Sequence, residues 1–342
     1  MGSLFAPTYS LTLGTQQWTE QVLGIEVRLE AAPLLDSLAV TFPVAAPVEA
    51  GQGDPAELTL GSGEKEELVF TGEVDSVRRT FRGIRVTALN AGGALARFRP
   101  AVTFEQLTAA SVIRKLAAEV GVSTGDLDDG VELAFYAADP TRTALEHVAR
   151  VAGWGGALAR VSARNRLEAT VIDATQAEVG LRYGREILAL WQDRMPSPVE
   201  SFTVAGESGA GSTSSPEALR PTTDFFGGSR PDGPSAAHRW RFEPALRTAQ
   251  GAASAGAAAT RLYQAGRERG NLEAFLQPDL RPGTILEVQD LPAGLPSGPL
   301  WVSGVCHRVG PRGAATRARF QKGGDAFDPL ALLGSLAGAL GL

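Results

Sequence analysis

Two adjoining stretches decide the fold: Glu67-Leu-Val-Phe-Thr-Gly-Glu-Val-Asp-Ser-Val77 and Gly83-Ile-Arg-Val-Thr-Ala-Leu89. Apolar and polar residues alternate in both, and a glycine separates them. Because successive side chains of a strand point to opposite faces, alternation at period two indicates strands with one buried face. The two stretches therefore predict a pair of half-buried antiparallel strands joined by a turn.

The same alternation extends outward in both directions from this pair. It appears upstream around Ile25, Val27 and Leu29 and around Leu58 and Leu60. It returns far downstream in three runs, 285–288, 300–309 and 316–320. We therefore predict a β-rich chain of the α+β class with strand domains at 1–98 and 177–326.

The middle of the chain has a different periodicity, which predicts a small inserted domain at 99–176. Residues 103–120 place apolar side chains on one helical stripe and end at Gly121. A second helix is predicted from the N-cap Asp139, followed by Pro140, to Gly153. A hairpin of strands at 156–161 and 167–172 completes this domain.

The second strand domain is predicted to contain a loop and a helix. Residues 206–235 are rich in Gly, Ser, Thr and Pro, which predicts a long flexible loop. Residues 249–269 are rich in Ala and predict a helix, although each of its glycines costs up to about 1 kcal/mol relative to Ala.

An internal similarity links the two strand domains. Residues 70–77, Phe-Thr-Gly-Glu-Val-Asp-Ser-Val, align with 302–309, Val-Ser-Gly-Val-Cys-His-Arg-Val, and a glycine and another alternating strand follow each. The similarity suggests a duplicated barrel. The alternative is a chance match between two strand and turn units in a Gly-rich β protein.

Length and composition restrict the classes of function. A chain of 342 residues accommodates about two domains. The net charge of −6 and pI near 5.3 argue against nucleic-acid recognition. We see no run near the roughly 18 apolar residues of a membrane span, and no secretory signal in Met1–Thr15. A single cysteine, Cys306, excludes an internal disulfide and a cysteine cluster for zinc.

A search for catalytic or metal-binding residues predicts no such site. His147, His238 and His307 are few and scattered, so we expect structural or surface roles. Cys306 and His307 are adjacent in a predicted strand and would point to opposite faces, which argues against a nucleophile and base pair.

Three short motifs also fail as functional sites. Ser208 lies in Gly206-Glu-Ser-Gly-Ala210, which lacks the last glycine of a nucleophile elbow. Gly61-Ser-Gly-Glu-Lys65 has the wrong spacing for a phosphate loop and predicts a hairpin turn. Asp126-Leu-Asp-Asp-Gly130 has its glycine at the fifth position and Ala137 where a calcium loop needs a glutamate. We predict no catalytic residue, cofactor or metal.

Several segments together resemble the phage late control protein D family, which forms the hub of contractile phage tails, contractile bacteriocins and related injection systems. The N-terminal part of the type VI secretion spike protein VgrG is similar. Residues 67–77 resemble the family's F-x-G-x-V strand, and 103–121 and 143–154 resemble its two helices. Leu280-Arg-Pro-Gly-Thr-Ile-Leu-Glu-Val288 resembles its late L-x-P-G turn and strand. The second helix lacks the family's aromatic pair, and 206–235 has no counterpart.

The resemblance implies a non-enzymatic hub with two similar tube-type β-barrel domains per chain. Three chains would present six barrels and adapt a sixfold inner tube to a threefold spike. The implied partners are a second and third copy, the spike protein, the inner tube or its initiator, and other baseplate proteins, assembled in a bacterial cytoplasm into a tail or tail-like particle. The alternative is a hub or effector that carries a cell-wall hydrolase activity.

The C-terminal tail, 327–342, is a candidate assembly segment because it is apolar and carries no charge after Asp328. Burying a leucine contributes about 1.5–3 kcal/mol, so these side chains should dock somewhere. The alternatives are a short helix folded back on its own barrel and a clasp against neighbouring chains or the spike. The tail is too short to span a membrane and lacks a basic flank, so we expect no stable membrane insertion. Its candidate residues are Leu330, Leu332, Leu333, Leu336, Leu340 and Leu342.

Overall fold

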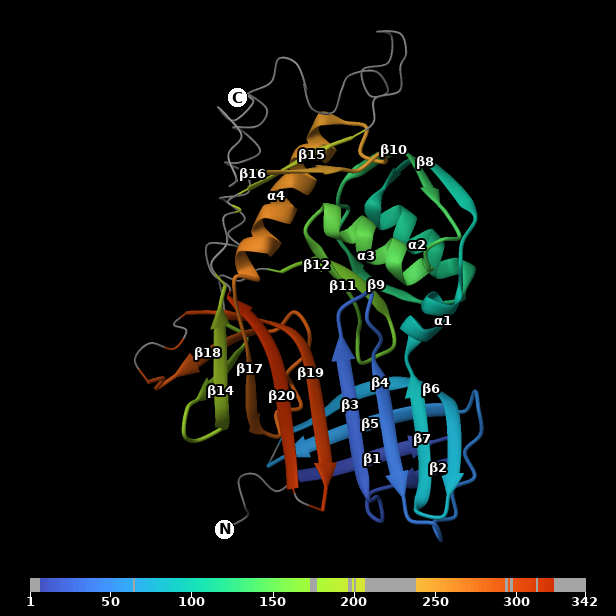
Figure 1. The fold of residues 1–342 in the computed structure, drawn as a ribbon. Coiled ribbons are helices and arrows are strands. Elements are labelled where there is room, and N and C mark those ends of the chain that lie inside the picture. The colour runs from blue at the N-terminus through green and yellow to red at the C-terminus, as the bar shows by residue number, and fades with distance from the viewer. Residues whose placement is uncertain are drawn as a thin grey trace.

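The computed structural model describes residues 7–322 except 64, 173–176, 196–198, 200, 207–237, 293–294, 296–297 and 312. Figure 1 shows a lower unit built of strands and an upper unit that holds most of the helices. The described chain is rich in strand and its largest sheet is mainly antiparallel. This confirms the predicted β-rich α+β class.

The first strand region forms the right half of the lower unit in Figure 1. Its alternating residues face the core, as predicted: Val27, Val74 and Val86 are each no more than 2% exposed. The stretches quoted first form the hairpin β6–β7, closed where Thr80 pairs with Gly83. The strands are β1 (Pro7–Leu13), β2 (Gln16–Trp18), β3 (Gly24–Glu30), β4 (Ser37–Phe42), β5 (Pro55–Ser62), β6 (Lys65–Thr80) and β7 (Gly83–Leu89).

The second strand region continues the same sheet. Strand β19 pairs antiparallel with β3, from Gly304 opposite Glu30 to Val309 opposite Ile25. This joint produces one 13-stranded sheet that runs through both regions. The strands of the second region are β13 (Val179–Arg182), β14 (Ile187–Arg194), β17 (Glu268–Phe275), β18 (Ile285–Gln289), β19 (Leu300–Gly310) and β20 (Gly313–Lys322).

The two regions have the same order of strands. With the short β2 set aside, the first region reads β3-β4-β7-β6-β5-β1 and the second reads β14-β17-β20-β19-β18-β13. Numbered along the chain within each region, both orders are second, third, sixth, fifth, fourth, first. One pair differs, since β1 and β5 are antiparallel and β13 and β18 are parallel. A duplication would produce this shared order; that the two regions superpose as similar barrels stays a prediction.

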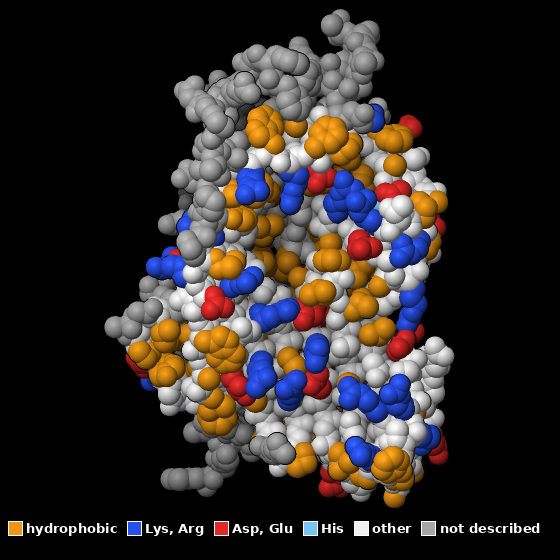
Figure 2. Space-filling view, viewed as in Figure 1, with side chains coloured by type: hydrophobic (Ala, Val, Ile, Leu, Met, Phe, Trp, Pro, Cys, Tyr) orange, Lys and Arg blue, Asp and Glu red, His pale blue; other side chains and the backbone are white. Residues whose placement is uncertain are grey.

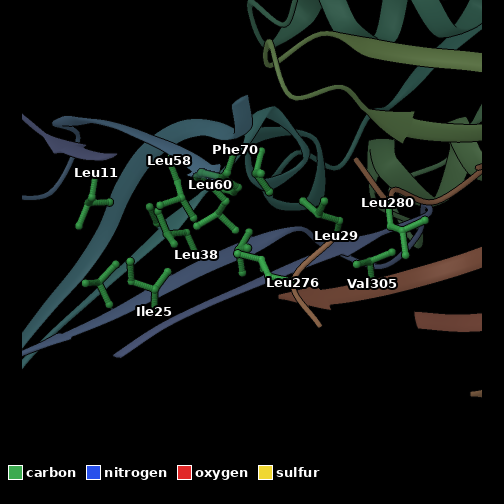
Figure 3. Close-up of a cluster of buried hydrophobic side chains, with 14 of the residues drawn as sticks. Leu11, Ile25, Leu29, Leu38, Leu58, Leu60, Phe70, Leu276, Leu280 and Val305 are labelled. Carbon is green, nitrogen blue, oxygen red and sulfur yellow. The ribbon is translucent and has the colours of Figure 1, made fainter. Parts of the chain in front are cut away.

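One hydrophobic core lies under both regions. Leu38, Leu58 and Phe70 of the first region and Leu280 and Val305 of the second belong to the same buried cluster. Figure 3 shows these side chains gathered between the strands of the two regions. Each fully buried leucine contributes about 1.5–3 kcal/mol, so the shared core holds the two regions together.

The upper unit has a second core of its own. Val148 and Ile113 on two helices pack there with Val204, Leu246 and Ala255. The last three residues lie between β14 and β17 in the sequence, so that segment returns to the upper unit before the lower sheet is completed. The elements are α1 (Ala91–Arg97), β8 (Val102–Thr108), α2 (Ala109–Glu119), β9 (Thr124–Leu127), β10 (Glu132–Ala138), α3 (Ala144–Trp154), β11 (Ala157–Val161), β12 (Leu167–Val171), β15 (Ser201–Ala205), β16 (His238–Phe242) and α4 (Ala249–Ala265).

The predicted helices all exist, but their bounds were partly wrong. Residues 103–108 of the first predicted helix belong to strand β8, where Phe104 pairs with Tyr136 of β10. The helix begins after Thr108, whose hydroxyl accepts a hydrogen bond from the Ser111 amide. Strand pairing satisfies the backbone of β8, which a stripe of apolar residues cannot reveal.

The other two helices differ at one end each. The N-cap of α3 is Thr143, not Asp139, because Thr143 and Glu146 form a reciprocal capping box. Helix α4 ends at Ala265 instead of 269, because β17 begins at Glu268 and pairs on both sides within the sheet. The hairpin β11–β12 lies where the sequence predicted it, with Asn165 in the left-handed region at its turn.

Polar contacts fix the upper unit to the lower sheet. Buried Asp36, between β3 and β4, accepts hydrogen bonds from the Glu30 amide at 2.5 Å and from Asn90 Nδ2 at 2.6 Å. Burial raises the pKa of Asp36 to about 7, although these two donors favour its charged form. On the second region, Arg160 Nη1 of the upper unit donates to the Pro282 carbonyl at 2.7 Å. The upper unit is thus bonded to both strand regions.

Candidate functional site

The buried histidine of the upper unit has a structural role, as predicted. His147 Nε2 lies 2.9 Å from the Asp139 carbonyl and therefore carries the proton. Its Nδ1 then accepts from the Tyr136 hydroxyl at 2.5 Å. Burial raises the pKa of Tyr136 to about 12, so the hydroxyl keeps its proton at neutral pH. Both ring nitrogens are satisfied within the core.

The adjacent Cys306 and His307 point to opposite faces of β19, as predicted. His307 is fully buried, and its Nδ1 lies 2.8 Å from the Thr316 hydroxyl. Cys306 lies on the outer face opposite Arg28. Burial, followed by the nearby Glu26 carboxylate, raises the pKa of the Cys306 thiol, which opposes formation of a reactive thiolate. The two residues cannot act as a nucleophile and its base.

The remaining sequence motifs are structural or fall outside the described chain. Residues 61–63 lie at the β5–β6 hairpin, where Gly63 has φ +66°, which agrees with the predicted turn. Asp128 is engaged by the Val171 amide at 2.7 Å. Among the described residues there is no group of three or more His, Cys, Asp or Glu placed to hold a metal ion. Ser208 and the side chain of His238 lie outside the description.

A depression of about 410 Å³ lies beside the β19–β20 turn. Its lining contains one carboxylate, Glu26, together with Arg85 and Arg308. Glu26 already pairs with Arg28 and with Arg308, whose Nε lies 2.8 Å from it. With its one acid held by two arginines, this depression lacks the pair of carboxylates that acid–base hydrolysis needs. Across the described helices, none has the length and apolar character needed to cross a membrane.

Charged side chains cover the outer face of the joint between the regions. Figure 2 shows Lys or Arg and Asp or Glu side chains intermixed in a band across the middle of the lower unit. Arg319 of β20 pairs with Glu30 of β3, and Arg317 pairs with Glu273 at 3.2 Å. Exposed pairs contribute little to stability, typically about 0–1 kcal/mol. This face is charged on both signs and internally matched.

Two strand edges of the sheet have no partner among the described residues. Strand β14 pairs with β17 on one side, and its other side ends the sheet. Strand β6 pairs with β7 along 73–80 but with β5 only up to Glu73. In Figure 1 these strands lie at opposite sides of the lower unit, β14 at the left and β6 at the right.

Large apolar side chains are exposed at both edges. On β14, Leu188 is 52% and Trp191 46% exposed, and at the β6–β7 turn Phe81 is 86% exposed. Natural edge strands are commonly protected by charges, prolines or short length, so apolar edges indicate contact surfaces. The sequence analysis missed them. The available signal was the run Ile187-Leu-Ala-Leu-Trp191, which is apolar on both faces of a strand.

The predicted C-terminal assembly segment lies outside the described residues, as does most of the 206–235 loop. The candidate contact surfaces that the structure describes are therefore the two sheet edges.

The fold matches those of solved tail proteins. A 43 kDa prophage tail protein from Shewanella oneidensis is 17% identical with a TM-score of 0.67, over 94% of this chain and 100% of the other. A tail protein from Neisseria meningitidis is 13% identical with a TM-score of 0.70, over 94% of this chain and 98% of the other. A type VI secretion component from E. coli is 14% identical with a TM-score of 0.62, over 93% of this chain and 78% of the other.

Sequence comparison adds no relative. No protein-family model matches the chain, and no curated protein matches its sequence. Across nearly its whole length, the chain has the fold of phage tail proteins and of a type VI secretion component, which agrees with the resemblance to the late control protein D group.

Proposed function

We propose that this protein is the structural hub of a contractile tail or injection system, a homotrimer that adapts a sixfold inner tube to a threefold spike. The observation that carries the proposal is the tail-protein fold, which covers 94% of this chain and all of the Shewanella oneidensis protein. The repeated strand order supports it, because two similar regions in each of three chains offer six related surfaces.

The test is the mass of the purified full chain, measured by light scattering alone and after mixing with the spike protein encoded beside it. We expect a particle of three copies in at least the mixed sample, and we expect the trimer to bind tube protein on the side away from the spike. A chain that stays monomeric with spike and tube both present would contradict the proposal.

We also propose that the hub itself is not an enzyme. The charged and nucleophilic residues described above are held in structural contacts, and the solved structures with this fold are described as tail proteins. Purified chain incubated with cell-wall peptidoglycan should release no soluble fragments. Release that is lost on Ser208→Ala or His307→Gln, but kept in a folded surface variant, would favour the hydrolase alternative.

A further inference from the structure

The joint between the two regions shows how one strand edge of this fold covers another. At that joint β3 pairs antiparallel with β19, and Val27 lies opposite His307. Both side chains are 0% exposed. The joint therefore buries one inward-facing pair completely and continues the sheet without a break.

The shared strand order identifies the counterparts of these two strands. Strand β3 is the second strand of the first region, and β14 is the second strand of the other. Strand β19 is the fifth strand of its region, and β6 is the fifth of the first. The counterparts, β14 and β6, are the two strands whose edges are free.

The residue correspondence follows from the ladders. The closing pair of β19–β20 is Gly310 with Gly313, and that of β6–β7 is Thr80 with Gly83. Counting back along the paired strands from these turns, Val77 takes the place of His307, and Leu190 takes the place of Val27. Val77 and Leu190 are both only partly buried against the main core.

We infer that β14 of one copy pairs antiparallel with residues 75–80 of β6 in a second copy, repeating between chains the β3–β19 joint found within the chain. The inference rests on the proposed assembly of several copies and names its contact. Leu190 then lies opposite Val77 and completes its burial. Trp191 lies opposite Ser76, and Ala189 lies opposite Arg78, on the outer face.

The local chemistry suits this pairing. The last backbone bonds from the loop before β5 reach β6 at Val74, whose amide lies 2.8 Å from the Asp54 carbonyl. Beyond it the edge is free to bond another strand. The exposed indole of Trp191 would lie one residue across from the exposed Arg78 side chain, a distance at which a guanidinium can stack on an aromatic ring.

The position of the edges determines the kind of assembly. Because they lie on opposite sides of the lower unit, each copy uses a different surface toward each neighbour. Such a head-to-tail contact closes into a ring when the rotation allows it. A trimer joined in this way alternates internal and intermolecular joints around the ring.

Cysteine cross-linking tests the contact directly. In a Cys306→Ser background, one chain carries Trp191→Cys and another carries Ser76→Cys. Directly opposed residues of an antiparallel pair lie about 4.5–5.5 Å apart between Cα atoms, within disulfide reach. Mild oxidation of the mixture, with spike protein present, should give a covalent dimer on a non-reducing gel. A chain carrying both substitutions should give a covalent trimer.

The control pairs Trp191→Cys with Thr87→Cys. Thr87 lies on β7, which has partners on both sides, so no cross-link should form. A trimer by light scattering without the Trp191–Ser76 cross-link would overturn the strand contact and leave the hub proposal intact. A chain that remains monomeric with spike and tube would overturn both.

Discussion

At the scale of single residues, the two glycines that the internal repeat aligns have different surroundings. A Cβ at Gly72 would overlap the backbone carbonyl oxygen of Leu89. A Cβ at Gly304 would instead meet the ends of the Arg319 and Glu30 side chains. The first obstacle is backbone and cannot move without shifting a strand, whereas the second is flexible.

We therefore expect Gly72→Ala to destabilise the protein more than Gly304→Ala. Overpacking against a fixed group costs about 1–3 kcal/mol, while long exposed side chains can turn aside. The measurement is the free energy of unfolding in urea for both variants and the wild type. Equal losses would show that the strand at Gly72 can shift as easily as a side chain.

Burial of His307 makes stability depend on pH. Burial lowers the pKa of His307 to about 4, and the nearby positive charge of Arg281 acts in the same direction while Asp279 opposes it. Between the ordinary value of 6.5 and 4, the unfolded chain binds a proton at this residue and the folded chain does not. The free energy of unfolding should therefore fall as pH falls through this range, by about 3 kcal/mol.

The matched variant is His307→Gln, which keeps an acceptor for the Thr316 hydroxyl and removes the titration. Urea unfolding at pH 7 and at pH 4.5 should show a smaller loss in the variant than in the wild type. The difference isolates His307 because Asp36, whose pKa is also displaced, contributes equally to both proteins. Parallel losses would mean that another group carries the pH dependence.

At the scale of elements, helix starts depend on which of several candidate caps finds a partner. Asp139 and Thr143 are both good N-cap residues four positions apart. Thr143 has Glu146 three residues later, and the Thr143 amide donates to the Glu146 carboxylate at 2.7 Å. Asp139 instead accepts from the Thr141 amide at 3.0 Å within a turn.

Thr143→Ala should cost about 1 kcal/mol of stability, the typical loss of an N-cap. Asp139→Ala should cost less, because it removes a bond in an exposed turn. Thermal unfolding of the two variants followed by circular dichroism provides the comparison. A larger loss for Asp139→Ala would place the start of the helix where the sequence pattern first indicated it.

At the scale of the whole molecule, the described units are already closed around two cores, so the C-terminal tail is a candidate for contacts between chains. Deletion of residues 328–342 should leave the thermal unfolding of the isolated chain almost unchanged and weaken association with other copies or the spike. The checks are the melting temperature of the shortened chain and its mass by light scattering with the spike present. Unfolding of the monomer with assembly spared would instead favour the tail folded back on its own barrel.

The sequence by itself determined which segments become strands and which of their faces are buried. Alternation at Ile25, Val27 and Leu29, and in the stretches 67–77 and 83–89, reports burial directly, because a strand has a side-chain period of two. The opposed faces of Cys306 and His307 follow from the same period. Sequence also located the β11–β12 hairpin, whose turn chemistry is local.

Only the tertiary structure decided which strands lie side by side. The pairing of β3 with β19 joins residues more than 270 positions apart, and periodicity carries no information on the partner of a strand. The same limit hid the strand nature of 103–108, which depends on β10, and the free edges of β14 and β6. An edge is free because of what is absent beside it in space, and that is a property of the assembled sheet, whereas the burial of a face is recorded in each strand's own residues.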